Sequence, residues 1–337
     1  MKKTHKPFNQ VQKLLFDQIE SLLPKQIVVA HEISDLLSLS TDAVYRRMRG
    51  EKKLNIEEIC TLCDHFDISI DDLLQRKMHN VRFETVPFHS DELDNFLSHL
   101  LTLGNTLKFY QPEKNNRILF LAGEIPFVHL ADYEELATFK LYTWANSVYN
   151  YPGNYTSFCE RVKSDKLFQC YREISAYYQQ IPSLEIWNAA TFDPTLGWID
   201  FYYETGNIEN REMALELCHQ LRQFISELQA KVEKSNKNGE PENNFHFYIS
   251  DVALENNFMI IKSENKRDCF LRLFSASGMI VRNQSYCEET EKWFYNQLDK
   301  STLISGSSKK ERHQFFDGLG KKMQSLMDKI ESKNTPG

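Results

Sequence analysis

Glycine and proline, the two residues that make most tight turns, are scarce in this chain. Its 337 residues include 12 glycines and 10 prolines, about half of the roughly 12% that the two reach together in average proteins. Phosphate-binding loops, β-repeat barrels and disordered linkers need more of them, because glycine supplies left-handed backbone and proline fixes turns. The scarcity favours a helix-rich globular protein over a loop-built enzyme.

The length and the charge point to two unlike domains. At roughly 150 residues per domain, a chain of 337 residues suggests two, and a hydrophobic fraction of 41% can fill their cores. The formal net charge of −7 by itself speaks against a nucleic-acid-binding protein. Residues 1–79, however, hold 12 basic and 12 acidic residues, so the whole excess of acid belongs to residues 80–337.

The sequence shows no secretion signal and no membrane span. The basic start at residues 1–7 is followed by polar residues such as Asn9 and Lys13, so no apolar signal core forms. The most apolar run, residues 118–122, is far shorter than the roughly 18 residues of a spanning helix. Seven scattered cysteines fit reduced thiols better than a disulfide framework. We expect a cytoplasmic protein without membrane association.

Apolar residues recur at helical spacing through the first eighty residues. Stripes over 11–22 and 33–37 predict two helices, and a third is expected over 41–48, after the polar break at 38–40. Two further helices begin with a capping residue followed three residues later by an acid: Asn55 with Glu58, and Ser69 with Asp72. The pattern therefore places two short helices, joined by a three-residue turn, among five.

This ordered spacing resembles the lambda-repressor and Cro-like (XRE) family of helix-turn-helix domains over about residues 8–78. The segment 33–50 is similar to the second and third helices of that family, and 55–74 to its fourth and fifth. The chain departs from the family at Ser38, where glycine is usual, at Met48, where an acid is usual, and near Ala30, where glutamine is frequent. Ser38 must then either adopt left-handed backbone, at a cost of about 1 kcal/mol, or reshape the turn.

The resemblance implies binding to double-stranded DNA, with the second short helix in the major groove and its first residues against base edges. The base-contacting residues are then Thr41, Asp42, Tyr45 and Arg46. Arg46 is the first choice among them, because its planar fork fits guanine O6 and N7 together, a contact that contributes about 1–3 kcal/mol of discrimination. The residues expected at phosphates are Ser40, Arg47, Arg49, Lys52 and Lys53. The alternative is that this basic run is only a solvated face.

Residues 80–337 are expected to form an α+β domain whose sheet is assembled from strands distant in sequence. Strands are expected over 81–88, 117–127, 245–250, 257–263 and 269–282, and helices dominate 133–228 and cover 288–298 and 309–332. A polar surface loop is expected near 234–244. The predicted fold class is an all-α five-helix helix-turn-helix domain followed by a larger α+β domain.

Two features suggest a homodimer. Four to five phosphate contacts per domain imply weak binding by one copy, which favours two copies on two half-sites. The helix expected over 309–332 carries a broad apolar face. That face either packs on its own domain or forms a dimer seam.

Aromatic residues crowd the segment 142–203, which suggests either ordinary packing or an effector pocket. For such a pocket, Glu134, Tyr142 and Trp144 are the candidates for polar and stacking contacts. No catalytic or nucleotide-binding motif is present, and the pair Cys60 and Cys63 lacks a second pair at metal-site distance. We therefore expect no enzyme activity, no cofactor and no metal.

The sequence predicts a cytoplasmic, bacterial-type transcriptional regulator. Residues 1–79 would bind DNA, and residues 80–337 would dimerise and sense a small-molecule or protein effector. A protein-interaction adaptor with a degenerate helix-turn-helix is the main alternative, and an enzyme fused to a DNA-binding domain is another.

Overall fold

The structure is a computed structural model that describes residues 8–23, 28–66, 68–73, 81–85, 93–239, 244–252, 254, 256–274 and 277–332. Two compact units divide the chain: the N-terminal unit, Met1–Asn80, and the C-terminal unit, Val81–Gly337. None of the helices within the described ranges combines the length and the apolar character that crossing a membrane requires.

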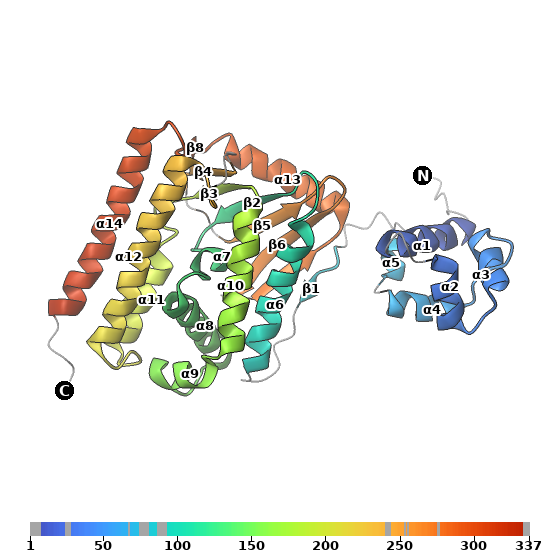
Figure 1. Cartoon of the computed structure of the whole chain (residues 1–337), viewed down its shortest axis with the longest axis horizontal. Coiled ribbons are helices and arrows are strands. Elements are labelled where there is room, and N and C mark those ends of the chain that lie inside the picture. The colour runs from blue at the N-terminus through green and yellow to red at the C-terminus, as the bar shows by residue number, and fades with distance from the viewer. Residues whose placement is uncertain are drawn as a thin grey trace, which may run out of the picture. The chain divides into compact units, whose positions relative to one another are not determined.

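The described part of the N-terminal unit contains the helices α1 (Phe8–Leu22), α2 (Val29–Leu37), α3 (Thr41–Met48), α4 (Ile56–His65) and α5 (Ile70–Leu73) (Figure 1). Their apolar faces meet in one small core, where Phe16, Ile33, Val44 and Leu62 come from four different helices and are buried. Val44 anchors α3 in this core. The opposite face of α3 is therefore left at the surface.

Three residues, Ser38, Leu39 and Ser40, join α2 to α3. Ser38 adopts left-handed backbone with φ 52° and ψ 44°, which confirms the first of the two conformations expected for a serine at this position. The turn closes when the Leu39 N–H donates to the Ser34 carbonyl at 3.0 Å. The Ser40 hydroxyl then caps α3 by accepting from the Ala43 N–H at 3.3 Å.

The capping box predicted at the start of α4 is confirmed. Asn55 Oδ1 accepts from the Glu58 N–H at 2.8 Å, and Glu58 Oε2 accepts from the Asn55 N–H at 3.0 Å. The side chain of Asp72, the segment 86–88 and residues 240–243 of the expected polar loop lie outside the described residues.

The C-terminal unit is built on one eight-stranded sheet with the order β1-β7-β6-β5-β2-β3-β4-β8. Its strands are β1 (Glu84–Thr85), β2 (Arg117–Ala122), β3 (Ser183–Trp187), β4 (Phe245–Ile249), β5 (Phe258–Lys262), β6 (Arg267–Phe274), β7 (Ser277–Val281) and β8 (Thr302–Leu303). β2, β3 and β4 run parallel, whereas the other neighbouring pairs are antiparallel. Phe120 of β2 lies beside Glu185 of β3, which lies beside Phe247 of β4.

The helices of this unit are α6 (Leu93–Tyr110), α7 (Phe127–Leu130), α8 (Glu134–Tyr149), α9 (Tyr155–Val162), α10 (Asp165–Gln180), α11 (Asp193–Glu204), α12 (Arg211–Lys234), α13 (Gln284–Leu298) and α14 (Lys309–Ser332). Side chains alternate along each strand, so Phe120 of β2 faces the large core shared with α6, α8, α10, α12 and α14, whereas Leu119 and Leu121 face a smaller core with α13. One face of the sheet is therefore covered by many helices and the other mainly by α13, as Figure 1 shows.

The predicted fold class is wrong. Helices α7 to α10 connect β2 to β3, and α11 and α12 connect β3 to the parallel β4. The chain as a whole is therefore mixed α/β, rather than an all-α domain followed by an α+β domain. The helical prediction over 133–228 overlooked β3, because Ser183 and Glu185 interrupt the apolar run that marks a buried strand.

Helix α14 packs its apolar face within its own unit. The buried residues of this face are Phe315, Phe316, Leu319, Met323, Leu326, Met327 and Ile330. They lie against α12, where Arg222 also donates to Gln324 Oε1 of α14 at 2.9 Å. Of the two interpretations of this helix, packing on its own domain is confirmed, and this buried face is not free to form the alternative dimer seam.

Candidate nucleic-acid interface

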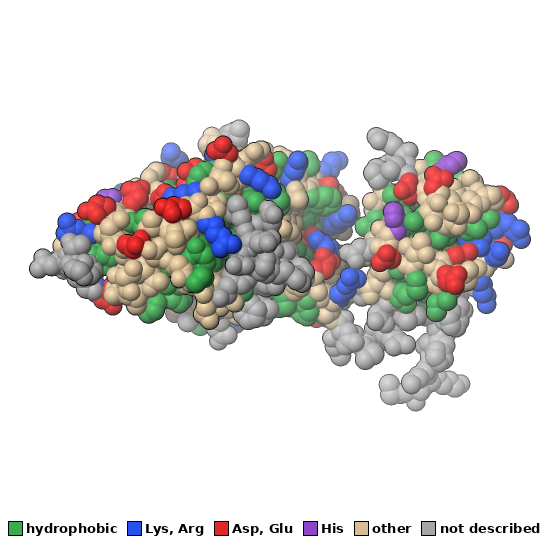
Figure 2. Space-filling view, turned by 90° about the horizontal axis from the view of Figure 1, so that it is seen from below, with side chains coloured by type: hydrophobic (Ala, Val, Ile, Leu, Met, Phe, Trp, Pro, Cys, Tyr) green, Lys and Arg blue, Asp and Glu red, His purple; other side chains and the backbone are tan. Residues whose placement is uncertain are grey.

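The outer face of α3 carries most of the residues predicted to contact bases. Asp42, Tyr45 and Arg46 are exposed, with 41% of Tyr45 and 55% of the Arg46 side chain accessible, and Thr41 is half-buried. Ser40, predicted at a phosphate, is exposed while its hydroxyl caps the helix. Figure 2 shows basic side chains gathered over the α3 end of the N-terminal unit, with acidic ones among them.

A glutamine of α1 holds the loop that follows α3. Gln12 Nε2 donates to the carbonyls of Arg47 at 2.7 Å and Lys52 at 2.9 Å, and Gln12 Oε1 accepts from the Leu54 N–H at 3.0 Å. The exposed cations on this loop are Arg49, Lys52 and Lys53. They project from a backbone that is fixed at both ends. Sequence reasoning missed Gln12, although a polar residue inside the apolar stripe over 11–22 was the available signal.

Arg47 is not placed to contact phosphate, which corrects the prediction for this residue. Its side chain is 4% accessible, and the guanidinium donates to Glu58 at 2.6 and 3.1 Å and to the Ala43 carbonyl at 3.0 Å. Arg47 follows the buried Val44 by three residues, so it points to the same inner face of the helix. Burial alone would raise the pKa of Glu58, but hydrogen bonds from Arg47 and from the Asn55 N–H hold it below its ordinary value.

An exposed acid partly neutralises the remaining arginines. Glu51 Oε1 lies 2.7 Å from Arg49 Nε, and Glu51 Oε2 lies 3.7 Å from Arg46 Nε. The hydrogen bond from Arg49 lowers the pKa of Glu51. A phosphate that approaches these arginines competes with this carboxylate.

The three residues predicted for an effector pocket do not come together. Trp144 lines a cavity of about 160 Å³. Tyr142 lies fully buried in an aromatic core, where its hydroxyl accepts from Asn207 Nδ2 at 3.2 Å. Glu134 is exposed at the start of α8, 3.9 Å from Arg172. Positions 142 and 144 point to nearly opposite sides of a helix because each residue turns it by about 100°, and this corrects the predicted pocket.

A buried polar cluster that the sequence did not reveal lies at β3. The Glu185 carboxylate accepts from the Ser183 hydroxyl at 2.9 Å and from Trp187 Nε1–H at 3.0 Å, and it lies 2.8 Å from His129 Nε2. The Tyr178 hydroxyl also donates to it. The adjacent cavity measures about 10 Å³, room for one water molecule. The cluster therefore fastens β3 to its helices and leaves no space for a substrate.

Two opposite charges are fully buried in this cluster. Burial alone would raise the pKa of Glu185, but the charges of His129 and Lys237 lower it to about 2. Lys237 Nζ donates to the carbonyls of Tyr178, at 2.9 Å, and Ile181. Burial lowers the pKa of Lys237 to about 7, although Glu185 acts in the opposite direction. The acid at position 185, between apolar neighbours, was the sequence signal for the cluster.

The cysteines and the acids form no metal centre in the described part of the chain, where three or more possible ligands do not gather at any point. Cys63 is buried in the core of the N-terminal unit, and Cys60 is exposed.

No protein-family model, no curated protein and no solved structure matches this chain. The case for a function therefore rests on the geometry of the two units.

Proposed function

We propose that this protein is a cytoplasmic transcriptional regulator that binds double-stranded DNA as a homodimer. The observation that carries the proposal is Arg46, exposed on α3 next to a basic loop that Gln12 holds in place. A short exposed helix behind a three-residue turn has the form that helix-turn-helix proteins place in the major groove. In this proposal the C-terminal unit dimerises and senses an effector.

The proposed DNA contacts are of two kinds, those to base edges and those to phosphates. On α3, Arg46 reads guanine through O6 and N7, and Tyr45 and Asp42 face neighbouring base edges. Arg49, Lys52 and Lys53 bind phosphates, which position the helix without reading sequence. With Arg47 buried, about three phosphate contacts remain per domain, and a dimer on two half-sites compensates for such a small footprint.

A second function is favoured by one observation. Glu51 forms ion pairs with Arg46 and Arg49, and these pairs reduce the positive potential that DNA would meet. A protein-interaction adaptor, with a helix-turn-helix that has lost DNA binding, would tolerate such an acid.

Selection of bound duplexes from a random DNA pool by the full-length protein separates the two functions. A regulator enriches one sequence and releases it as salt rises. Arg46→Ala should weaken binding to the enriched sequence by roughly five- to a hundredfold and binding to random DNA much less. Arg172→Ala, which removes an exposed arginine of α10, is the matched control. Absent or salt-independent binding contradicts the proposal and favours the adaptor.

A further inference from the structure

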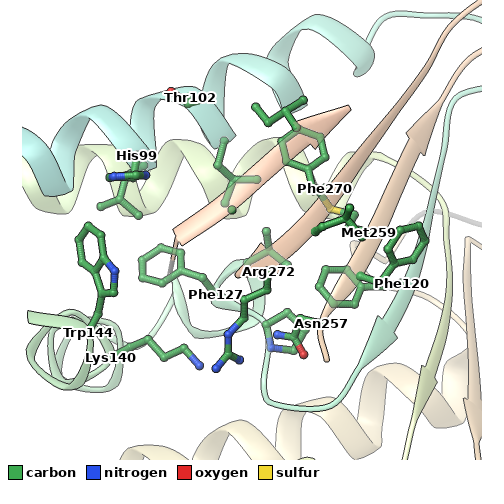
Figure 3. A pocket seen from close by; sticks show the side chains of 18 of the residues that line it. His99, Thr102, Phe120, Phe127, Lys140, Trp144, Asn257, Met259, Phe270 and Arg272 are labelled. Atoms are coloured by element: carbon green, nitrogen blue, oxygen red, sulfur yellow. The ribbon is translucent and has the colours of Figure 1, made fainter. Parts of the chain in front are cut away.

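A cavity of about 160 Å³ lies in the C-terminal unit between α6, α8 and the strands β5 to β7 (Figure 3). Its walls are mainly apolar and include the side chains of Phe96, Phe120, Phe127, Trp144, Met259 and Phe270. A protein cavity of about 150 Å³ admits benzene. This space therefore holds an apolar body about the size of one aromatic ring.

One end of the cavity is cationic. Lys140 and Arg272 both line it, and their charged groups point to the same end (Figure 3). Glu124 forms ion pairs with both side chains but is not among the residues that line the cavity. Lys140 Nζ also donates to the Ile125 carbonyl at 3.1 Å. Two cations thus share one carboxylate, and both cations face the cavity.

The surroundings of Lys140 and Arg272 disfavour their charged forms. The side chain of Lys140 is 7% accessible, and that of Arg272 is 26% accessible. Burial lowers the pKa of Lys140 well below its ordinary value, and the charge of Arg272 lowers it further. One carboxylate, that of Glu124, serves both side chains. A second anion that enters here would stabilise the charged forms of Lys140 and Arg272, so it is bound favourably.

We propose that this cavity binds a small organic carboxylate with an apolar, ring-sized body. The carboxylate lies between Lys140 Nζ and the Arg272 guanidinium, where it balances the second cation, and the ring lies among Phe127, Trp144 and Phe270. Only the role of this ligand as an effector rests on the proposed regulatory function. Binding itself requires no DNA.

Calorimetric titration of the full-length protein, without DNA, tests the charge requirement. The probes are phenylacetate and its neutral isostere phenylacetamide. Phenylacetate should bind at least about tenfold more tightly, because hydrogen bonds between charged groups are stronger than neutral ones. Arg272→Gln should remove this advantage, and Arg172→Gln, at an exposed arginine of α10, should preserve it. Equal affinity for the two probes, or no saturation by phenylacetate in the millimolar range, overturns the inference.

A second variant tests the location without changing the charge. Gly278 lines the cavity and pairs with Arg272 across β6 and β7, so a side chain at this position projects to the same face of the sheet. A Cβ at Gly278 would meet the Leu271 carbonyl at 3.6 Å, an ordinary contact. Gly278→Val should therefore fold normally, as tryptophan fluorescence will report, and lose both probes. Undiminished phenylacetate affinity in the folded variant overturns the inference.

The inference and the proposed function fail separately. Phenylacetate binding by a protein that binds no DNA supports the inference and overturns the regulatory role. Sequence-specific DNA binding by a protein that does not bind phenylacetate overturns the inference alone.

Discussion

On the proposed DNA-binding face, the side chain of Glu51 competes with phosphate for two arginines. Its ion pairs with Arg46 and Arg49 are exposed, so they contribute little to stability, but they reduce the positive charge that the two arginines present to DNA. Glu51→Gln should therefore tighten DNA binding several-fold, most strongly at low salt, where charges are least screened. Fluorescence anisotropy with a labelled duplex measures the change.

The matched control for this variant is Glu20→Gln, which removes an exposed acid from α1 and should leave the affinity unchanged. Unchanged or weaker binding by Glu51→Gln would show that the two arginines do not act on DNA.

At the scale of elements, the pair Arg47 and Glu58 joins α3 to the start of α4. Arg47→Met leaves the Glu58 carboxylate without its partner in a site that is 13% accessible. We expect the unit to lose about 3 kcal/mol of stability, the low end for breaking a buried ion pair, because Glu58 keeps some contact with water. Hydrogen exchange of the amides in α3 and α4 measures this loss.

The double variant Arg47→Met with Glu58→Gln should recover most of the lost stability, because the new glutamine carries no charge and its side-chain oxygen can still accept from the Asn55 N–H. If Arg47→Met instead weakened DNA binding with no change in exchange, Arg47 would be a phosphate contact after all.

Local sequence patterns predicted an element well where its own residues, rather than contacts with distant segments, determine it. The helix over 309–332 was predicted with its observed ends because its apolar face repeats without interruption. The single strand expected over 269–282 is instead the pair β6 and β7, because only two residues of the sequence separate the two strands and both have apolar residues. β3 was missed because its buried polar residues are stabilised by hydrogen bonds from distant helices, which a local pattern does not contain.

The site residues likewise divide into those that a local pattern predicts and those that depend on contacts between distant segments. Helical spacing predicted a face of α3 that carries Tyr45 and Arg46, but it did not show that Arg47 turns inward to an acid eleven residues away. The cavity near Trp144 joins α6 and α8 to strands more than a hundred residues later. Such a site depends on strand order, which no segment of the sequence encodes by itself.

At the scale of the whole molecule, two buried charges make stability depend on pH in two windows. Glu185 has its pKa lowered from 4.5 to about 2, so the unfolded chain binds the proton first and stability falls between pH 4.5 and 2. Lys237 has its pKa lowered from 10.5 to about 7, so the unfolded chain keeps a proton that the folded chain releases, and stability rises from pH 7 to 10.5.

Thermal unfolding followed by tryptophan fluorescence reports on this unit, because all four tryptophans lie in residues 81–337. Lys237→Met should flatten the rise between pH 7 and 10.5. Because the charge of Lys237 also helps to lower the pKa of Glu185, the same variant should reduce the fall in stability between pH 4.5 and 2. An unchanged rise in this variant would assign the dependence to another group.

The salt dependence of DNA binding links the basic footprint to the number of copies bound. The chain carries a net charge of −7, but binding depends on the phosphates that are neutralised locally. With Arg49, Lys52 and Lys53 as the phosphate contacts, the slope of log K against log salt should be about −3 for one domain and about −5 for a dimer. Lys52→Ala should reduce the slope by about 1 in a monomer and about 2 in a dimer, with equal effects on specific and random DNA.

The control Lys310→Ala removes an exposed cation of α14 and should change neither the slope nor the affinity. A slope near zero would mean that the basic loop is not at DNA, and a slope near −3 that falls by 1 in Lys52→Ala would mean that one copy binds alone.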